Sequence, residues 1–136
     1  MARWLVKTEP STYAFEDLVR EGRTAWTGVK NALAQKHLRA MAAGDEVLVY
    51  HTGDVKAVVG SARVVGAPHP DPTDTAGRLA CVDLAPGKAL AVPVTLAALR
   101  AERACAGWEL LVQARLSVMP VPEAAWATVQ RLARKA

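Results

Sequence analysis

EVLVYHTGDVKAVVGSARVV, residues 46–65, carries the clearest structural signal in the chain. Its first six residues contain a continuous apolar run, from Val47 to Tyr50. Residues 58–65 alternate, with Val58 and Val64 on one face and Arg63 on the other, as in a half-buried strand. The Thr-Gly-Asp sequence between the two runs is typical of a hairpin turn. We therefore predict an antiparallel pair of strands.

Further strands are predicted on both sides of this hairpin. Residues 3–7 have the pattern of a short strand, and LACVDL (79–84) alternates between apolar and other residues. LAVPV (90–94) is predicted to be an edge strand, because Pro93 has no backbone N–H for a second neighbour. A Pro-Gly pair at 86–87 is predicted to turn the chain between these two strands.

Four segments combine helical spacing with residues that favour helix ends. They begin near Thr12, cover residues 32–42, follow Thr95 and follow Pro122. No internal repeat, low-complexity tract or linker interrupts the pattern. We predict one α+β domain over residues 1–136, a curved antiparallel sheet or small barrel flanked by helices.

The composition excludes several classes of protein. A chain of 136 residues is long enough for one domain with its own core. Its apolar runs are too short to span a bilayer, and no stretch of signal-peptide length precedes Pro10, so a cytoplasmic location is expected. Cys81 and Cys105 form no Cys-x-x-Cys unit, which favours reduced thiols over a disulfide framework or a zinc site.

The net charge of +4 is unevenly distributed along the chain. Residues 1–44 hold seven basic and four acidic residues, residues 45–93 hold four and six, and residues 94–136 hold six and three. If the two ends of the chain meet in space, they would form one basic face that attracts phosphate groups.

No pattern typical of an enzyme is present. The histidines at 37, 51 and 69 lie far apart, and there is no His-Glu-x-x-His motif, nucleophile elbow or glycine-rich phosphate loop. We therefore expect no catalytic activity, cofactor or metal. One alternative stays open: a small hydrolase that uses His51 with an acid such as Asp45.

A few side chains are candidates for recognition. Trp26 stands in a polar loop, where it either plugs the core or forms a wall for a flat ligand. A wall outside the core predicts that Trp26→Ala removes binding with little change in the thermal midpoint. Asn31 either caps a helix or reads a base edge. Tyr50 and His51 end a strand on opposite faces, so one of them is expected to face the core, and Ser117 is either a turn or a site residue.

Five segments together carry a family resemblance: WLVKTEP (4–10), WTGVKN (26–31), MAAGDEVLVYHT (41–52), HPDPT (69–73) and RLSVMPV (115–121). In this order and spacing they resemble the EVE domain family of the PUA-like superfamily, a relative of the YTH readers of methylated adenine. The resemblance implies a pseudo-barrel with a pocket at its mouth. It also implies non-catalytic binding of DNA or RNA through one modified base, with methylated or hydroxymethylated cytosine the usual suggestion.

The resemblance also implies which residues contact the ligand. Those implied for the base pocket are Trp26, Gly28, Val29, Asn31, Tyr50, His51, Leu116 and Ser117. Lys7 and Thr8 also match the family pattern. We expect them to contact the flanking phosphates together with Lys30 and Arg115, which come from the two basic ends of the chain. No cofactor, metal or membrane is implied, and a monomer is the default expectation. The open alternative is a free modified nucleoside, nucleotide or similar metabolite in the same pocket.

Some positions differ from the family pattern. Lys30, Thr52 and His69 stand where the family commonly has Arg, Ser and Tyr, and an aromatic residue usual after the HPDPT turn is missing. The changes at Lys30 and Thr52 keep the charge and the hydroxyl, and the last two differences leave open which base fits, not whether a base fits.

Overall fold

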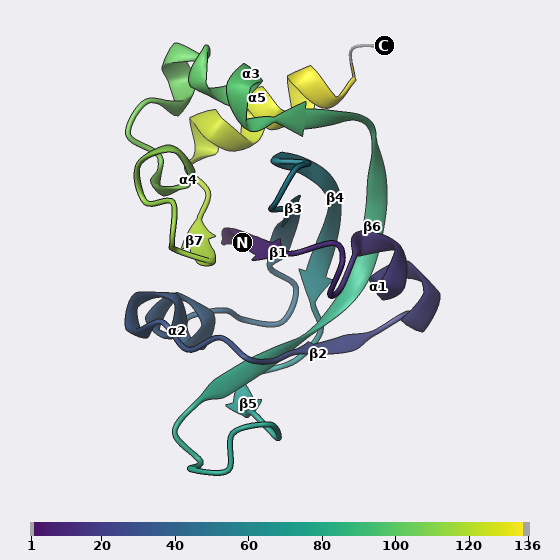
Figure 1. Cartoon of the computed structure of the whole chain (residues 1–136), viewed down its shortest axis with the longest axis vertical. Helices are drawn as coiled ribbons and strands as arrows, with labels where there is room; N and C mark the ends of the chain where they lie inside the picture. Colours follow the sequence, from purple (N-terminus) through teal and green to yellow (C-terminus); the bar gives the residue numbers. More distant parts are fainter. Residues whose placement is uncertain (1, 135–136) are drawn as a thin grey trace.

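A curled, mixed sheet forms the centre of the molecule in the computed structural model, which describes residues 2–134 (Figure 1). Its path is β2-β6-β4-β3-β1-β7, and β5 pairs with β6. The strands are β1 (Arg3–Thr8), β2 (Thr24–Trp26), β3 (Glu46–His51), β4 (Ala57–Val64), β5 (His69–Pro70), β6 (Ala80–Thr95) and β7 (Val118–Pro120). The predicted curved sheet flanked by helices is confirmed.

The helices lie around this sheet (Figure 1). They are α1 (Phe15–Glu21), α2 (Ala32–Arg39), α3 (Leu96–Arg100), the 3-10 turn η1 (Arg103–Cys105), α4 (Glu109–Val112) and α5 (Glu123–Ala133). Two predicted caps are confirmed: the side chain of Asn31 accepts from the Ala34 N–H at 2.9 Å, and that of Thr95 accepts from the Ala98 N–H at 3.1 Å. Among the described residues no helix is both long and apolar enough to cross a membrane.

The prediction of a purely antiparallel sheet is wrong at one pair of strands. β3 and β4 pair antiparallel as expected, but β1 and β3 run parallel, from Arg3 opposite Glu46 to Thr8 opposite His51. The connection that carries α1, β2 and α2 returns the chain to the starting end of β1, as a parallel pair requires. β7 then pairs antiparallel with β1, so the first and the last strand of the chain lie side by side.

The predicted turn at Pro86 and Gly87 is also wrong, because β6 continues through both residues from Ala80 to Thr95. A Cβ added to Gly87 would lie 2.5 Å from the Ser61 hydroxyl oxygen, so this glycine permits a close approach of β6 to β4. β2 pairs with the first half of β6, at residues 82–84, whereas Pro93 lies in the second half. Within the described residues this second half pairs with β4 alone, as expected of an edge strand.

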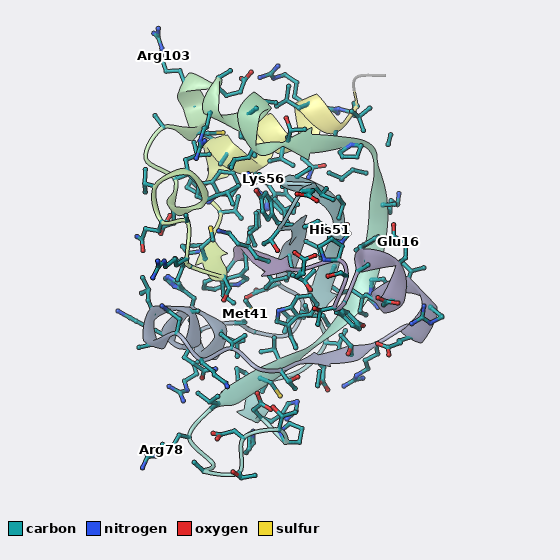
Figure 2. The ribbon with its side chains drawn as sticks, viewed as in Figure 1. Glu16, Met41, His51, Lys56, Arg78 and Arg103 are labelled. Carbon is teal, nitrogen blue, oxygen red and sulfur yellow. The ribbon has the colours of Figure 1, made fainter. Side chains whose placement is uncertain are left out.

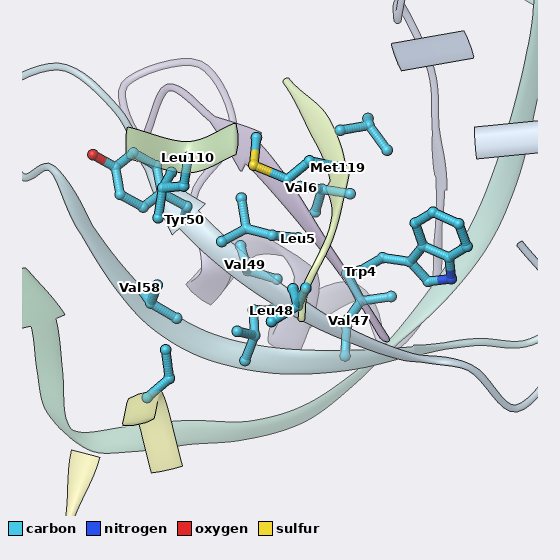
Figure 3. Close-up of a cluster of buried hydrophobic side chains, with 14 of the residues drawn as sticks. Trp4, Leu5, Val6, Val47, Leu48, Val49, Tyr50, Val58, Leu110 and Met119 are labelled. Atoms are coloured by element: carbon cyan, nitrogen blue, oxygen red, sulfur yellow. The ribbon is translucent and has the colours of Figure 1, made fainter. Parts of the chain in front are cut away.

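Apolar side chains from the central strands fill the inside of the curled sheet (Figure 3). Leu5, Leu48 and Met119, from three different strands, are fully buried. Tyr50 belongs to the hydrophobic core, as expected for one residue of this pair, and His51 is buried as well, at 5% exposed, outside the core cluster. The second face of β3 is shielded here as well, because the start of α1 lies against His51.

Candidate functional site

A cavity of about 440 Å³ opens between the end of β1, the strand β2 and the residue before β7. Its volume is in the range of ligand pockets, roughly 300–1,000 Å³. Six of the sequence-predicted site residues line it: Lys7, Thr8, Trp26, Gly28, Val29 and Ser117. Five lining residues were not predicted: Thr12, Tyr13, Thr24, Ala25 and Thr27.

Trp26 lies on a strand that the sequence analysis placed in a loop. Residues 24–26 form β2 because they pair antiparallel with residues 82–84 of β6. The Trp26 side chain belongs to the hydrophobic core and is only 8% exposed, yet it also lines the cavity. The interpretation of Trp26 as a core residue is confirmed. It also forms part of the cavity wall, and its contact with a flat ligand stays a prediction.

Tyr13 and Trp26 form an aromatic corner, which we define as these two rings meeting at 85° with their centroids 5.9 Å apart. Tyr13 is held from both ends, because the Thr8 hydroxyl donates to its carbonyl at 2.6 Å and its own hydroxyl donates to Glu21. Burial, together with this carboxylate, raises the pKa of Tyr13, so the phenol stays protonated at neutral pH. The corner is thus a fixed, uncharged surface.

Lys7 brings a positive charge to the cavity wall. Its ammonium group donates to the Ala114 carbonyl at 3.0 Å and lies 5.7 Å from the centroid of the Tyr50 ring. Its backbone N–H donates to the Ser117 carbonyl at 2.9 Å. Burial lowers the pKa of Lys7. Lys7 therefore ties β1 to the segment before β7 and keeps N–H donors beside the cavity.

Gly28 is held in place by the loop that contains the HPDPT segment. Its backbone adopts a positive φ of 78°, and its N–H donates to Asp71 at 2.8 Å. Asp71 is buried and also accepts from the backbone and hydroxyl of Thr73, at 2.7 and 2.6 Å. Burial opposes ionisation of Asp71, but these hydrogen bonds outweigh it and hold the pKa of its carboxyl below the usual value. The HPDPT segment therefore shapes the cavity from outside.

The other six predicted site residues do not line this cavity. Asn31, Leu116 and Arg115 line a separate hollow, and Lys30 is exposed between the two. Tyr50 lies beside the ammonium group of Lys7. For these residues, contact with a base or a phosphate stays a prediction.

His51 has a structural role that the sequence did not indicate. Its Nε2 accepts the N–H of Phe15 at 3.0 Å, at the first residue of α1. Figure 2 shows His51 on the side of the sheet near Glu16 of the same helix. Burial lowers the pKa of His51, which favours the neutral ring that this hydrogen bond requires.

The alternative of a hydrolase that pairs His51 with Asp45 is not supported by the structure. The two residues stand at opposite ends of β3, about 20 Å apart at the usual rise of a strand. Asp45 is buried and accepts from the Trp4 indole N–H at 3.0 Å and from the Ala42 N–H at 2.9 Å. In the part of the chain that the structure describes, no three His, Cys, Asp or Glu side chains gather in a way that could hold a metal ion.

In the sequence, only the position of Tyr13 could have indicated that it belongs to the site: it lies three residues after the WLVKTEP segment and just before α1. Spacing alone does not show that it reaches Trp26, because the contact depends on the pairing of β2 with β6.

Comparison with known proteins gives a consistent result. The EVE domain model matches residues 2–132. Human thymocyte nuclear protein 1 is 32% identical over an alignment of 84 residues, with 53% of this chain and 37% of that protein covered, so the chain spans little more than a third of the length of the curated relatives it matches.

Two solved structures extend the likeness over almost the whole chain. Rpa0253 from Rhodopseudomonas palustris is 42% identical with a TM-score of 0.91, covering 98% of this chain and 93% of its own. Human THYN1 protein, solved in complex with 5-methylcytosine containing DNA, is 24% identical with a TM-score of 0.91, covering 100% and 99%.

Proposed function

This chain belongs to the EVE domain family, and from that premise we propose that it is a non-catalytic module that binds nucleic acid by taking one modified base into the cavity beside Trp26. The observation that carries the proposal is the aromatic corner in a cavity of about 440 Å³. The human relative solved with 5-methylcytosine containing DNA supports methylated cytosine as the first ligand to test.

The aromatic corner suits a flat ligand that carries a small apolar group. A base stacked on one ring gains about 1–3 kcal/mol, and the second ring then meets the edge of the base. A methyl group on that edge makes further apolar contact, worth about 1–3 kcal/mol. The modified base should therefore bind roughly 10–200-fold more tightly than the unmodified one. Because extracting a base from a duplex costs a few kcal/mol, single-stranded ligand should bind more tightly than duplex.

Polar groups around the aromatic corner can form hydrogen bonds with the polar edge of the base. The hydroxyls of Thr12, Thr27 and Ser117 line the cavity and make no hydrogen bond to another described residue. They can each donate and accept, as the polar edge of a pyrimidine requires. Leaving such an edge unpaired would cost about 1–3 kcal/mol, so these groups would select the type of base.

Cations near the cavity would contact the strand on either side of the base. Lys7 lies at the wall, while Lys30 and Arg115 are exposed and form no ion pair with a described acidic residue. A few contacts of this kind suit a module that holds a short stretch of backbone.

The test is a fluorescence anisotropy titration with short labelled strands that differ in one base. We expect single-stranded DNA with one 5-methylcytosine to bind at least about tenfold more tightly than the unmodified strand. Matched RNA strands and the free nucleoside are titrated in parallel. Equal affinity for modified and unmodified strands would refute the modified-base reading, and equal affinity for nucleoside and strand would favour a free small-molecule ligand.

The same titrations are repeated with Tyr13→Leu, which keeps an apolar side chain but removes one ring of the corner. We expect the preference for the methylated strand to fall with the overall affinity, because the ring that meets the edge of the base is gone. A full preference in Tyr13→Leu would refute a role for the corner in recognising the modification.

A further inference from the structure

A second hollow, of about 320 Å³, lies next to the cavity and is lined by Asn31, Leu33 and residues 113–116. Two stretches of backbone line both spaces. One passes from Val29 in the cavity to Asn31 in the hollow, and the other passes directly from Leu116 in the hollow to Ser117 in the cavity.

The wall between the two spaces is therefore thin. Two residues of chain reach at most about 7 Å, and neighbouring residues have Cα atoms about 3.8 Å apart. Lys7 reinforces this wall, since its side chain lines the cavity and its ammonium group holds the Ala114 carbonyl at 3.0 Å.

The lining of the hollow suits a nucleobase. Arg115 offers a planar guanidinium on which a base can stack, and Gln113 offers an amide that can donate and accept. Among the described residues, neither side chain makes a hydrogen bond or an ion pair with the protein. Leu33 adds apolar surface that is 37% exposed.

The charges along the wall match the link between two nucleosides. Lys7, Lys30 and Arg115 flank it, and no acidic residue lines either space. A phosphodiester that joins a nucleoside in the cavity to one in the hollow would carry its negative charge over this wall.

We propose that this hollow seats the nucleoside next to the modified one, so that the domain recognises two consecutive nucleotides of a strand. The proposal rests on the proposed function, since it needs the modified base in the cavity. It predicts a dependence of affinity on the neighbouring base that the cavity alone would not produce.

The test compares strands in which one neighbour of the 5-methylcytosine, on the 5′ or the 3′ side, is a normal nucleotide or an abasic residue. The abasic residue keeps the phosphate and removes only the base. We expect its introduction on one of the two sides to weaken binding at least about fivefold in the wild type. With Arg115→Gln this difference should shrink to less than about twofold.

Arg103→Gln is the matched control, since it removes the same charge from an exposed position on η1, away from α2 (Figure 2). It should retain the full loss at the abasic position. Equal binding of normal and abasic strands on both sides, with the 5-methylcytosine preference intact, would overturn this inference and leave the proposed function standing. Loss of that preference altogether would instead overturn the proposed function, and this inference with it.

Discussion

Replacing Trp26 by alanine should lower both stability and ligand affinity, because its side chain belongs to the core and lines the cavity. Large buried aromatic residues cost about 3–5 kcal/mol of unfolding free energy when truncated to alanine. The space left by Trp26 would join an existing cavity, so we expect the lower end, about 3 kcal/mol. For a domain of this length this corresponds to a fall of about 12 °C in the thermal midpoint.

The same substitution should weaken binding of the methylated strand by about 5- to 150-fold, the equivalent of 1–3 kcal/mol of stacking. Affinity is measured by anisotropy well below the midpoint of the variant, so that the loss reflects the missing ring and not unfolded protein. Thermal unfolding is followed by circular dichroism on the same samples.

Two further variants separate the effects. Trp26→Phe keeps an aromatic face and should retain most of the affinity, with a stability loss of about 1–2 kcal/mol. Trp126→Phe changes a tryptophan on α5 that does not line the cavity; the Arg3 Cζ atom lies over its ring, 4.6 Å from the ring centroid. It should leave binding unchanged.

Either half of this reasoning can fail on its own. A folded Trp26→Ala protein that binds like the wild type would refute Trp26 as a wall of the binding site. An unchanged thermal midpoint would refute its place in the core.

Three other measurements test the structure. Gly60→Ala should lower the free energy of unfolding, measured with denaturant, by about 2 kcal/mol, because the new Cβ would lie 2.5 Å from ring atoms of buried Phe15. The folded variant should bind the ligand with unchanged affinity. An unchanged unfolding midpoint would contradict this packing. The hydrogen bond and the charge of Asp83 raise the pKa of His69 in the folded protein. The wild type should therefore be more stable than His69→Gln below the unfolded pKa of about 6.5, and this difference should disappear as the pH rises through the raised pKa. A difference in stability found only at high pH would contradict this sign. Affinity for DNA should fall with salt on a shallow slope that reflects few phosphate contacts, and a salt-independent affinity would argue against a polymer ligand.

The elements that the sequence predicted well are those whose signal is local. The 46–65 hairpin and the caps at Asn31 and Thr95 depend on alternation and on residues a few positions away. The parallel pairing of β1 with β3 has no local signal. The path of β6 through Pro86 and Gly87 depends on Ser61 of β4, whose position along β6 is not visible in the sequence.

The cavity was predictable only in part for a similar reason. Trp26, Gly28 and Ser117 belong to segments that resemble the EVE family, and the fold brings them together. Asn31 belongs to one of these segments as well, but its helix-capping role turns it toward the second hollow. Tyr13 belongs to none of them, so only the tertiary structure reveals its contact with Trp26.

The bond from Lys7 to Ala114 joins positions 107 residues apart, and Ser117 supplies the last wall of the cavity. A growing chain on the ribosome therefore exposes β1 and Trp26 long before the segment that completes the cavity has been synthesised. Binding of the ligand would then show that synthesis has passed β7. Bound ligand would also favour, by mass action, the folded arrangement in which Lys7 is bonded to Ala114. A nascent chain arrested before residue 114 should be unable to bind, even with all its aromatic cavity residues in place.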